Sequence, residues 1–365
     1  MTNREKDILQ LIKDNPFISQ EEIASILNIA RSSVAIHITN LINKGYIQGR
    51  GYIVNQNNYV LVVGGSNIDI TGFSINDIVL MDSNPGIVNM SLGGVGRNIA
   101  ENLAKLDLNV KFITAVGKDI YGKKIMEHSK EVGIDMGNSL ISSKNQTSIY
   151  LAILNKNRDM EVAISDMNIC NELTVSFLKS RKGIIQNSEV MVLDTNLPGK
   201  SIEYLLNTYK KPIFLDTVST AKTEKVKDII GKFHTIKPNK LEAEILADIK
   251  INDEDDAKKA CQILISKGVK QVFLTMGENG IICANENEII KIDSPKIEII
   301  NATGAGDAFN AALIYSYLNN FDLKKSGIFA LGASIITLKS KNAISENMSI
   351  ENIEKILKEM NLYAK

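Results

Sequence analysis

The chain has 365 residues, and its 42 lysines and arginines balance its 42 aspartates and glutamates, so the net charge is zero. This length exceeds one small domain and suits one large domain accompanied by a smaller one. Because the chain has no overall basic field, its composition gives no sign of nucleic acid binding over the whole surface. The cysteines Cys170, Cys261 and Cys283 form no CxxC pair, which argues against a zinc site or a disulfide framework and fits a reducing compartment.

The hydrophobic pattern gives no sign of a membrane segment. Polar residues 1–7 lead directly into an amphipathic helical pattern, which differs from a signal peptide. No uninterrupted apolar run approaches the ~18 residues of a transmembrane helix. We therefore expect a cytoplasmic protein with no membrane partner.

The first part of the chain, residues 1–57, contains three short helical patterns. Isoleucine and leucine recur at helical spacing in three segments, at residues 3–14, 20–27 and 31–44. Ser19 with Glu22 predicts a capping box at the second start, and Gly45 predicts the end of the third helix. Residues 46–54 indicate a small hairpin around two glycines.

This arrangement resembles a winged helix-turn-helix, a family whose third helix enters the DNA major groove. The implied DNA-binding residues are Arg31, Ser33, His37 and Arg50. Six basic against five acidic side chains leave one net positive charge, which is little for a phosphate-binding module, and a small helical dimerisation domain is the alternative. Polar residues 56–58 predict the linker, so we expect domains at 1–57 and 58–365.

A buried strand is expected at residues 59–65, where a continuous apolar run ends in glycines. It delivers Asn67 and Asp69 to its carboxyl end, the edge of an open α/β sheet at which ligands bind. The Asp69 carboxylate can accept hydrogen bonds from two adjacent hydroxyls, which suits a sugar. An Asx turn after the strand is the alternative for Asp69.

A glycine-rich turn begins at Gly93 and precedes a helix that is expected to run to Leu106. Gly93 and Gly94 permit close backbone approach to a small polar ligand, and Asn98 supplies both a donor and an acceptor. A dinucleotide-binding fingerprint is the alternative, but the GGxGxN spacing here lacks the GxGxxG pattern.

A second glycine turn lies at residues 303–307 and opens into an apolar helical run at 308–318. Gly304 and Gly306 let the backbone approach an anion closely, so this turn predicts a cradle of N–H groups at a helix start. Asp307 beside that cradle suggests a base that activates a hydroxyl next to a phosphoryl group. An ordinary helix N-cap after a glycine turn is the alternative.

Residues 93–100 and 303–307 resemble the two signatures of the ribokinase-like (PfkB) carbohydrate and nucleoside kinases, in the family's order and separation. The resemblance covers the chain from Tyr59 onward. Within the family, three details resemble pseudouridine kinases: residues 82–86, Arg97 and residues 165–168.

The resemblance implies an α/β fold, a ribokinase-like three-layer α/β/α sandwich with a small β-sheet lid. We expect lid strands within about residues 70–92 and 147–166, the latter alternating as a hairpin. Further strands alternate with helical patterns, as a parallel sheet requires, at residues 110–116, 189–194, 212–216, 234–237 and 271–275. Another strand is expected at residues 297–300, directly before the second glycine turn.

The resemblance also implies roles for individual residues. The implied catalytic residues are Asp307 as the base and Gly304, Ala305 and Gly306 as the anion hole. The implied substrate-binding residues are Asn67, Asp69, Gly93, Gly94, Arg97, Asn98, Thr147 and Asn168. The implied ATP-binding residues are Asn239, Thr275, Gly277, Gly280, Thr303 and Asn342, and Glu242 is implied to hold Mg²⁺ through water. For Thr147 and Asn168, a turn residue without a ligand is the alternative.

The implied reaction is ATP-dependent phosphorylation of the 5′-hydroxyl of a ribosyl nucleoside, with pseudouridine as the expected substrate and ATP and Mg²⁺ as the cofactors. The family makes a monovalent cation a candidate cofactor too, although Asn301 replaces an acid that many relatives carry two residues before Thr303. Ribose, inosine or another nucleoside is the alternative substrate. A DNA-binding regulator that senses a nucleoside or sugar is the alternative function. We expect a homodimer, because relatives are commonly dimers and winged helices usually bind DNA as dimers.

Overall fold

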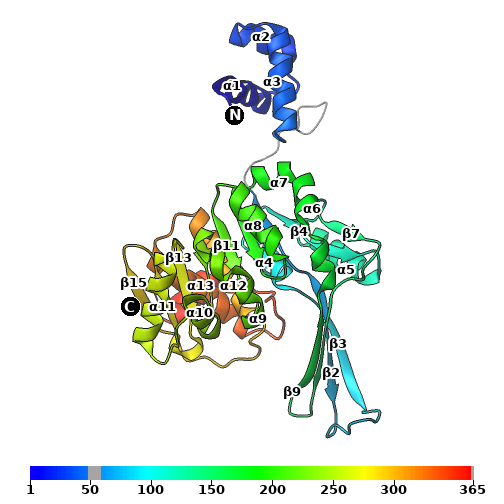
Figure 1. Ribbon diagram of the computed structural model, residues 1–365, viewed down its shortest axis with the longest axis vertical. Helices are drawn as coiled ribbons and strands as arrows, with labels where there is room; N and C mark the ends of the chain where they lie inside the picture. Colours follow the sequence, from blue (N-terminus) through cyan, green and yellow to red (C-terminus); the bar gives the residue numbers. More distant parts are fainter. Residues whose placement is uncertain (48–58, 363–365) are drawn as a thin grey trace. The chain divides into compact units, whose positions relative to one another are not determined.

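The computed structural model describes residues 1–47 and 59–362 (Figure 1). It contains two compact units. The N-terminal unit is Met1–Tyr59 with Lys179–Glu189, and the C-terminal unit is Val60–Leu178 with Val190–Lys365. Within the described residues, the chain has no helix both long and apolar enough to span a bilayer.

The N-terminal unit begins with three helices, α1 (Asn3–Asp14), α2 (Gln20–Leu27) and α3 (Arg31–Asn43). Capping boxes set the first two starts, Thr2 with Glu5 and Ser19 with Glu22, because these side chains bond N–H groups that the helix leaves unpaired. Apolar side chains from all three helices form one buried core. Gly45 follows α3 with a φ of +77°, so the predicted helices, the Ser19 box and the glycine end are confirmed.

The predicted hairpin at 46–54 falls almost entirely on residues 48–58, which lie outside the described residues. Arg50 lies there too. The fold of the wing is therefore described only up to Ile47.

A short helix from the middle of the chain, α7 (Lys182–Asn187), belongs to the N-terminal unit. Its backbone approaches the end of α3 closely, since a Cβ on Gly45 would lie 3.3 Å from Gly183 Cα. Asn187 Nδ2 donates a hydrogen bond to the Lys44 carbonyl oxygen at 3.3 Å. Glycine at both contact positions lets the two backbones meet.

The C-terminal unit is built on a nine-stranded sheet in the order β15-β14-β13-β12-β11-β10-β1-β4-β6. Its strands are β1 (Val60–Val63), β4 (Val110–Ile113), β6 (Ile134–Asp135), β10 (Val190–Asp194), β11 (Ile213–Asp216), β12 (Thr235–Ile236), β13 (Gln271–Thr275), β14 (Ile281–Ala284) and β15 (Ile289–Ile292). Neighbours from β6 to β13 are parallel, and β14 and β15 join antiparallel. The central strands β1, β10 and β11 are apolar apart from the aspartates that end β10 and β11, because both faces of a parallel sheet are covered.

Helices cover this sheet in two layers (Figure 1). One layer contains α4 (Val95–Lys105), α12 (Ala305–Leu318), α13 (Leu323–Leu338) and α14 (Ile350–Glu359). The other contains α8 (Gly199–Thr208), the 3-10 helix η2 (Glu224–Lys232), α10 (Lys240–Ala247) and α11 (Glu254–Ser266). Shorter or more peripheral helices are α5 (Ile120–Glu131), α6 (Val175–Ser180), α9 (Thr220–Thr223), η1 (Asn168–Glu172) and η3 (Gly277–Asn279). The predicted three-layer α/β/α sandwich is confirmed.

A second sheet forms the lid, in the order β3-β2-β8-β9, and Figure 1 shows its strands projecting from the body of the unit. Its strands are β2 (Asn67–Ser74), β3 (Gly86–Gly93), β8 (Ile149–Leu154) and β9 (Met160–Asp166). Asn67 pairs with Gly93 at the base of the lid. The lid therefore grows directly out of the two predicted substrate-binding segments, and its strands lie close to the ranges expected for them, 70–92 and 147–166. Two further strands, β5 (Ala115–Gly117) and β7 (Leu140–Ser142), pair only with each other and form a third sheet among the described residues.

Two strand predictions are wrong. Residues 297–300 form no strand; Ile299 and Ile300 are more than half exposed, and the Ile300 N–H donates to the Leu338 carbonyl oxygen at 2.9 Å. The segment is held by the end of a helix rather than by a neighbouring strand. The strand predicted at 110–116 is divided at Thr114 into β4 and β5, which belong to different sheets.

Candidate active site

The strand ends of the main sheet gather carboxylates. Asp194 ends β10 and Asp216 ends β11, and both are buried. Asp194 Oδ2 accepts the N–H groups of Gly65 at 2.8 Å and Gly96 at 2.9 Å. It thereby ties the end of β1 to the first turn of α4. Burial raises the pKa of Asp194, and the backbone hydrogen bond from Gly65 opposes that rise. Neither aspartate was predicted, since a single acid ending an apolar strand carries no motif.

The first glycine turn lets the start of α4 pack closely against the start of β2, the strand that carries Asn67 and Asp69. Gly94 has a φ of +100°, and a Cβ there would lie 2.5 Å from Ser66 Cα. A Cβ on Gly93 would overlap the Asp69 carboxylate. Asn67 Nδ2 donates to Asp69 Oδ1 at 2.5 Å, while burial raises the pKa of Asp69.

The two predicted motifs meet at one hydrogen bond. Asn98 Nδ2 donates to Asp307 Oδ2 at 2.8 Å, although the two residues are 209 positions apart. Asp307 lies in the first turn of α12, is 8 % exposed, and so is almost shielded from water. Burial, followed by the nearby Asp216 carboxylate, raises the pKa of Asp307 to about 8, and the Asn98 hydrogen bond and Lys237 oppose this. The arrangement supplies a carboxylate that changes protonation near neutral pH.

Arg97 contacts this pair through Asn98 and is 4 % exposed. Its Nη1 donates to the Leu92 carbonyl oxygen at 3.0 Å and to Asn98 Oδ1 at 3.1 Å, and its Nη2 pairs with Glu101. Because Asn98 Oδ1 faces the guanidinium, its amide N–H groups face Asp307. The protein itself thus occupies both Arg97 Nη atoms.

Two predicted substrate residues form their recorded hydrogen bonds with residues other than Asn98 and Asp307. Thr147 is buried; its hydroxyl donates to Asp119 Oδ1 at 2.7 Å and accepts the Gly117 N–H at 2.9 Å. Asn168 is exposed at the start of η1, where its N–H donates to Asp166. Thr147 therefore fixes a turn at the base of the lid.

The second glycine turn is pinned to the loop after α13. Gly304 has a φ of +82°, and a Cβ there would overlap the Ala343 carbonyl oxygen. The Asn301 amide connects the two loops, because Nδ2 donates to the Lys341 carbonyl oxygen at 3.0 Å and Oδ1 accepts the Thr303 N–H at 2.9 Å. α12 begins at Ala305, three residues earlier than predicted, so Ala305 and Gly306 lie in its first turn with Asp307.

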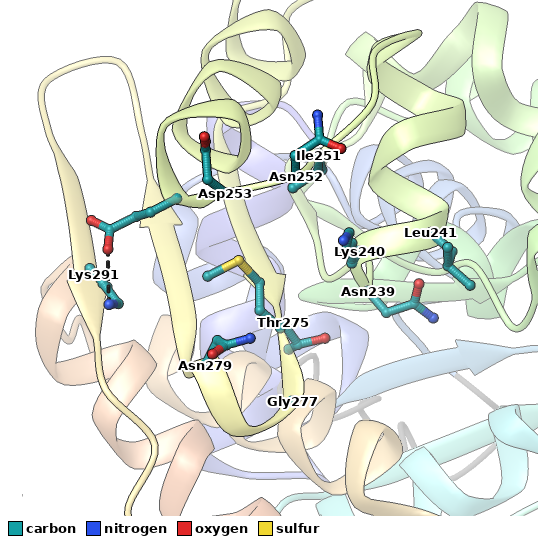
Figure 2. A pocket seen from close by; sticks show the side chains of 12 residues that line it. Asn239, Lys240, Leu241, Ile251, Asn252, Asp253, Thr275, Gly277, Asn279 and Lys291 are labelled. Carbon is teal, nitrogen blue, oxygen red and sulfur yellow. Dashed lines mark ion pairs between the residues drawn. The ribbon is translucent and has the colours of Figure 1, made fainter.

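A cavity of about 530 Å³ adjoins the end of β13 (Figure 2). Asn239, Thr275 and Gly277 line it, with the start of α11 on another side. Asn239 caps α10 in a box with Glu242, whose Oε2 accepts the Asn239 N–H at 2.9 Å. The structure therefore brings three of the predicted ATP-binding residues to one cavity.

Two other nucleotide candidates are not among the residues that line this cavity. Gly280 has a φ of +84° and ends the η3 turn. Asn342 lines a different cavity, of about 620 Å³, next to Lys341.

Among the described residues, there is no cluster of three or more histidine, cysteine or acidic side chains that could hold a metal. Glu242 is 4 % exposed, and only one hydrogen bond to its carboxylate is recorded among them. Mg²⁺ is usually held by one or two carboxylates together with waters and substrate phosphates. A single carboxylate that acts through water therefore fits Mg²⁺.

In the N-terminal unit, Arg31 opens α3 with a side chain that is 67 % exposed and forms an ion pair with Glu21 at 3.4 Å. Ser33 and His37 are half-buried on the same helix. The His37 Nδ1 atom is buried without a hydrogen-bond partner among the described residues.

Comparison with known proteins shows to which families the two parts of the chain belong. Residues 57–350 match the model of the pfkB family of carbohydrate kinases, and residues 1–48 match a winged helix-turn-helix DNA-binding model. An uncharacterised sugar kinase, YeiI of Escherichia coli, is 35 % identical over 96 % of this chain and 98 % of its own. The pseudouridine kinase of E. coli is 35 % identical over 82 % of this chain and 96 % of its own.

Solved structures agree as well. A putative sugar kinase from Clostridium perfringens superposes with a TM-score of 0.76 at 38 % identity, covering 84 % of this chain and 97 % of that one. Ribokinase from Thermotoga maritima has the same fold, with a TM-score of 0.73 at 23 % identity over 82 % of this chain and 99 % of that one. The chain belongs to the pfkB family of carbohydrate kinases and carries an N-terminal winged helix-turn-helix.

Proposed function

We propose that this protein transfers the γ-phosphoryl group of MgATP to the 5′-hydroxyl of a ribosyl nucleoside, with pseudouridine as the preferred substrate. The observation that carries the proposal is the Asn98–Asp307 hydrogen bond, which joins the substrate motif to the carboxylate beside the glycine turn. A base must lie within hydrogen-bond reach of the hydroxyl that it activates. Ligands held by Asn98 lie next to Asp307.

In this mechanism Asp307 accepts the hydroxyl proton as the nucleoside oxygen attacks the phosphorus. A pKa of about 8 makes Asp307 a much stronger base than an ordinary aspartate. The N–H groups of Gly304, Ala305 and Gly306 stabilise charge on the transferring group, as preorganised donors at a helix start do. Asp69, with Asn67, Gly93, Gly94 and Asn98, holds the ribose hydroxyls, and closure of the lid excludes water.

We assign the cavity lined by Asn239, Thr275 and Gly277 to ATP. Gly280, Thr303 and Asn342 are the remaining nucleotide contacts in the proposal. Glu242 would hold Mg²⁺ through water, and the ion would offset the charge of the phosphates.

Support for pseudouridine comes from the relative named pseudouridine kinase, at 35 % identity over 82 % of this chain. Relatives named guanosine-inosine kinase and ribokinase, at 26 % and 25 % identity, keep other nucleosides and ribose as the alternatives. Arg97 contributes to this preference in the proposal by holding Asn98. A regulator that only senses the ligand is opposed by the intact Asp307 and its glycines.

The substrate is tested by ATP-dependent phosphorylation of pseudouridine, uridine, inosine, adenosine, ribose and fructose. We expect the highest kcat/KM for pseudouridine, because a 5′-hydroxyl that reaches Asp307 is combined with recognition of the base. A 5′-deoxynucleoside, which lacks the acceptor oxygen, is the control and is expected to give no product. Preference for another compound would remove pseudouridine from the proposal, and no turnover on any would favour the sensor.

The glycine turn is tested by Gly304→Ala. The new Cβ must be placed at a positive φ and against the Ala343 carbonyl oxygen, so the N–H groups of the turn should shift. We expect kcat to fall roughly 10²–10³-fold, the effect of losing one anion-hole donor. Gly133→Ala is the matched control, since Gly133 has a similar φ of +81° and open surroundings. Equal activity of the two variants would contradict the anion-hole role.

We also propose that the glycine turn needs no monovalent cation. A cation between the two loops would be held by oxygen atoms, but here the Asn301 amide N–H already takes one of the two lone pairs of the Lys341 carbonyl oxygen. The amide carries out the bridging that a bound ion would otherwise provide. The donor set is therefore a poor fit for such an ion.

The prediction is that kcat is the same in potassium chloride and in tetramethylammonium chloride at matched ionic strength. Asn301→Asp is the comparison variant, because its carboxylate would repel the Lys341 carbonyl oxygen and create a demand for a cation. We expect potassium to activate that variant alone. Strong activation of the unmodified protein by potassium would contradict the proposal.

We further propose that the N-terminal winged helix-turn-helix binds DNA upstream of its own gene, with two chains on one site. Arg31 is exposed at the start of α3, and its surface ion pair with Glu21 costs little to break. Ser33 and His37 lie farther along the same helix, and Arg50, which lies outside the described residues, completes the proposed contacts.

Arg31→Ala should weaken binding of the full chain to that DNA. It should also reduce the slope of log Kd against the logarithm of the salt concentration by about one, the contribution of one phosphate contact. Lys13→Ala, at the end of α1, is the matched control and should leave both unchanged. Gel-shift titration over a range of salt concentrations measures the effect, and sedimentation of the complex should give two chains per duplex. Failure of the full chain to shift its upstream DNA would contradict the proposal.

A further inference from the structure

A buried lysine that the proposed mechanism leaves unused lies beside the glycine turn. Lys237 follows β12 directly, at the same sheet edge as the buried aspartates, and is 8 % exposed. Its Nζ atom would lie 2.9 Å from a Cβ built on Gly306. The ammonium group is therefore close to the backbone that forms the proposed anion hole.

The surroundings of Lys237 keep it charged. Burial alone would lower the pKa of Lys237, but Asp216, Glu242 and Asp307 together hold it above its ordinary value. Asp194 lies in the same group of buried acids, since its carboxylate also acts on Asp307. A single ammonium group thus faces several carboxylates, and MgATP would bring further negative charge to this place.

Lys237 has more hydrogen-bond donors than its one recorded partner uses. An ammonium group carries three N–H donors. Among the described residues, its recorded polar partner is Asp216 Oδ2 at 3.6 Å, a long contact that uses at most one of the three donors. Asp216 has a second support, because Asn310 Nδ2 donates to the same oxygen at 3.4 Å. The remaining donors lie beside the proposed anion hole, where a phosphoryl oxygen would bind.

We propose that Lys237 is a further catalytic residue whose ammonium group contacts the transferring γ-phosphoryl group. The inference rests on the proposed kinase function. In the reaction, the bond from the nucleoside oxygen to phosphorus forms, the bond from phosphorus to the β-phosphate oxygen breaks, and ADP leaves. The hydroxyl proton goes to Asp307, and Lys237 keeps its protons throughout and acts by charge and hydrogen bonding.

The competing account is that Lys237 only neutralises Asp216 in the fold. Removal of one member of a buried ion pair leaves an uncompensated charge, whereas removal of both is often tolerated. Lys237→Met and the double variant Asp216→Asn/Lys237→Met therefore separate the two accounts. Lys210→Met, at an exposed lysine, is the matched control for the change of side chain.

We expect Lys237→Met to lower kcat roughly 10²–10³-fold, as loss of a preorganised charge at the reacting group does. The double variant should remain as slow, with a melting temperature close to that of the unmodified protein. Recovery of kcat in the double variant would overturn the proposal, and so would normal kcat in Lys237→Met. In either case turnover by the unmodified protein would leave the kinase function intact.

Equilibrium binding supplies a second measurement that needs no turnover and no folded Lys237→Met single variant. The unmodified protein and the double variant are titrated with MgADP and with the Mg²⁺ complex of the non-hydrolysable analogue AMP-PNP. We expect the double variant to bind AMP-PNP at least about tenfold more weakly, because one charge-assisted contact is lost, and to bind ADP equally well. Equal loss for both nucleotides, or loss for neither, would overturn the contact with the γ-phosphoryl group.

Discussion

The site depends on burying ionisable carboxylates where two helices start. Asp307 in the first turn of α12 is bonded to Asn98 in α4, and this contact fixes both helix starts against the strand ends. Burial of a carboxylate without partners is costly. Asp194 is stabilised by hydrogen bonds from backbone N–H groups. Asp216 is stabilised by an ion pair with Lys237 and a hydrogen bond from Asn310. The main sheet, the turns and the lid together hold these groups in place.

Asp307 has fewer compensating contacts, and its chemistry follows from that. Its pKa rises from 3.8 to about 8, so the folded protein binds a proton that the unfolded chain releases. The stabilisation from that proton is complete below about pH 4 and is lost as the pH rises toward 8. A base that the fold tolerates poorly when ionised is one that readily accepts a proton from a hydroxyl. Asn98, oriented by Arg97, limits the penalty so that ionisation still occurs near neutral pH.

Local patterns predicted much of this site, and long-range contacts account for the rest. Both glycine turns follow from backbone geometry, and the capping box at Ser19 follows from residue spacing alone. Asp194 and Lys237 were missed as site residues, because a single polar residue at a strand end acquires its role only when other strands lie beside it. The strand predicted at residues 297–300 failed for a related reason: β-rich composition does not supply a neighbouring strand to pair with.

The most direct test of the central claim is the pH dependence of kcat/KM for the unmodified protein and for Asp307→Asn. Asn98, Asp194, Asp216 and Lys237 surround Asp307, so its ionisation should appear in the free enzyme at a pKa well above that of an ordinary aspartate. The account predicts that kcat/KM rises with pH through that ionisation, and that Asp307→Asn loses roughly 10²–10⁴-fold in rate together with the rise. An Asp307→Asn protein with near-normal turnover and an unchanged pH profile would contradict it.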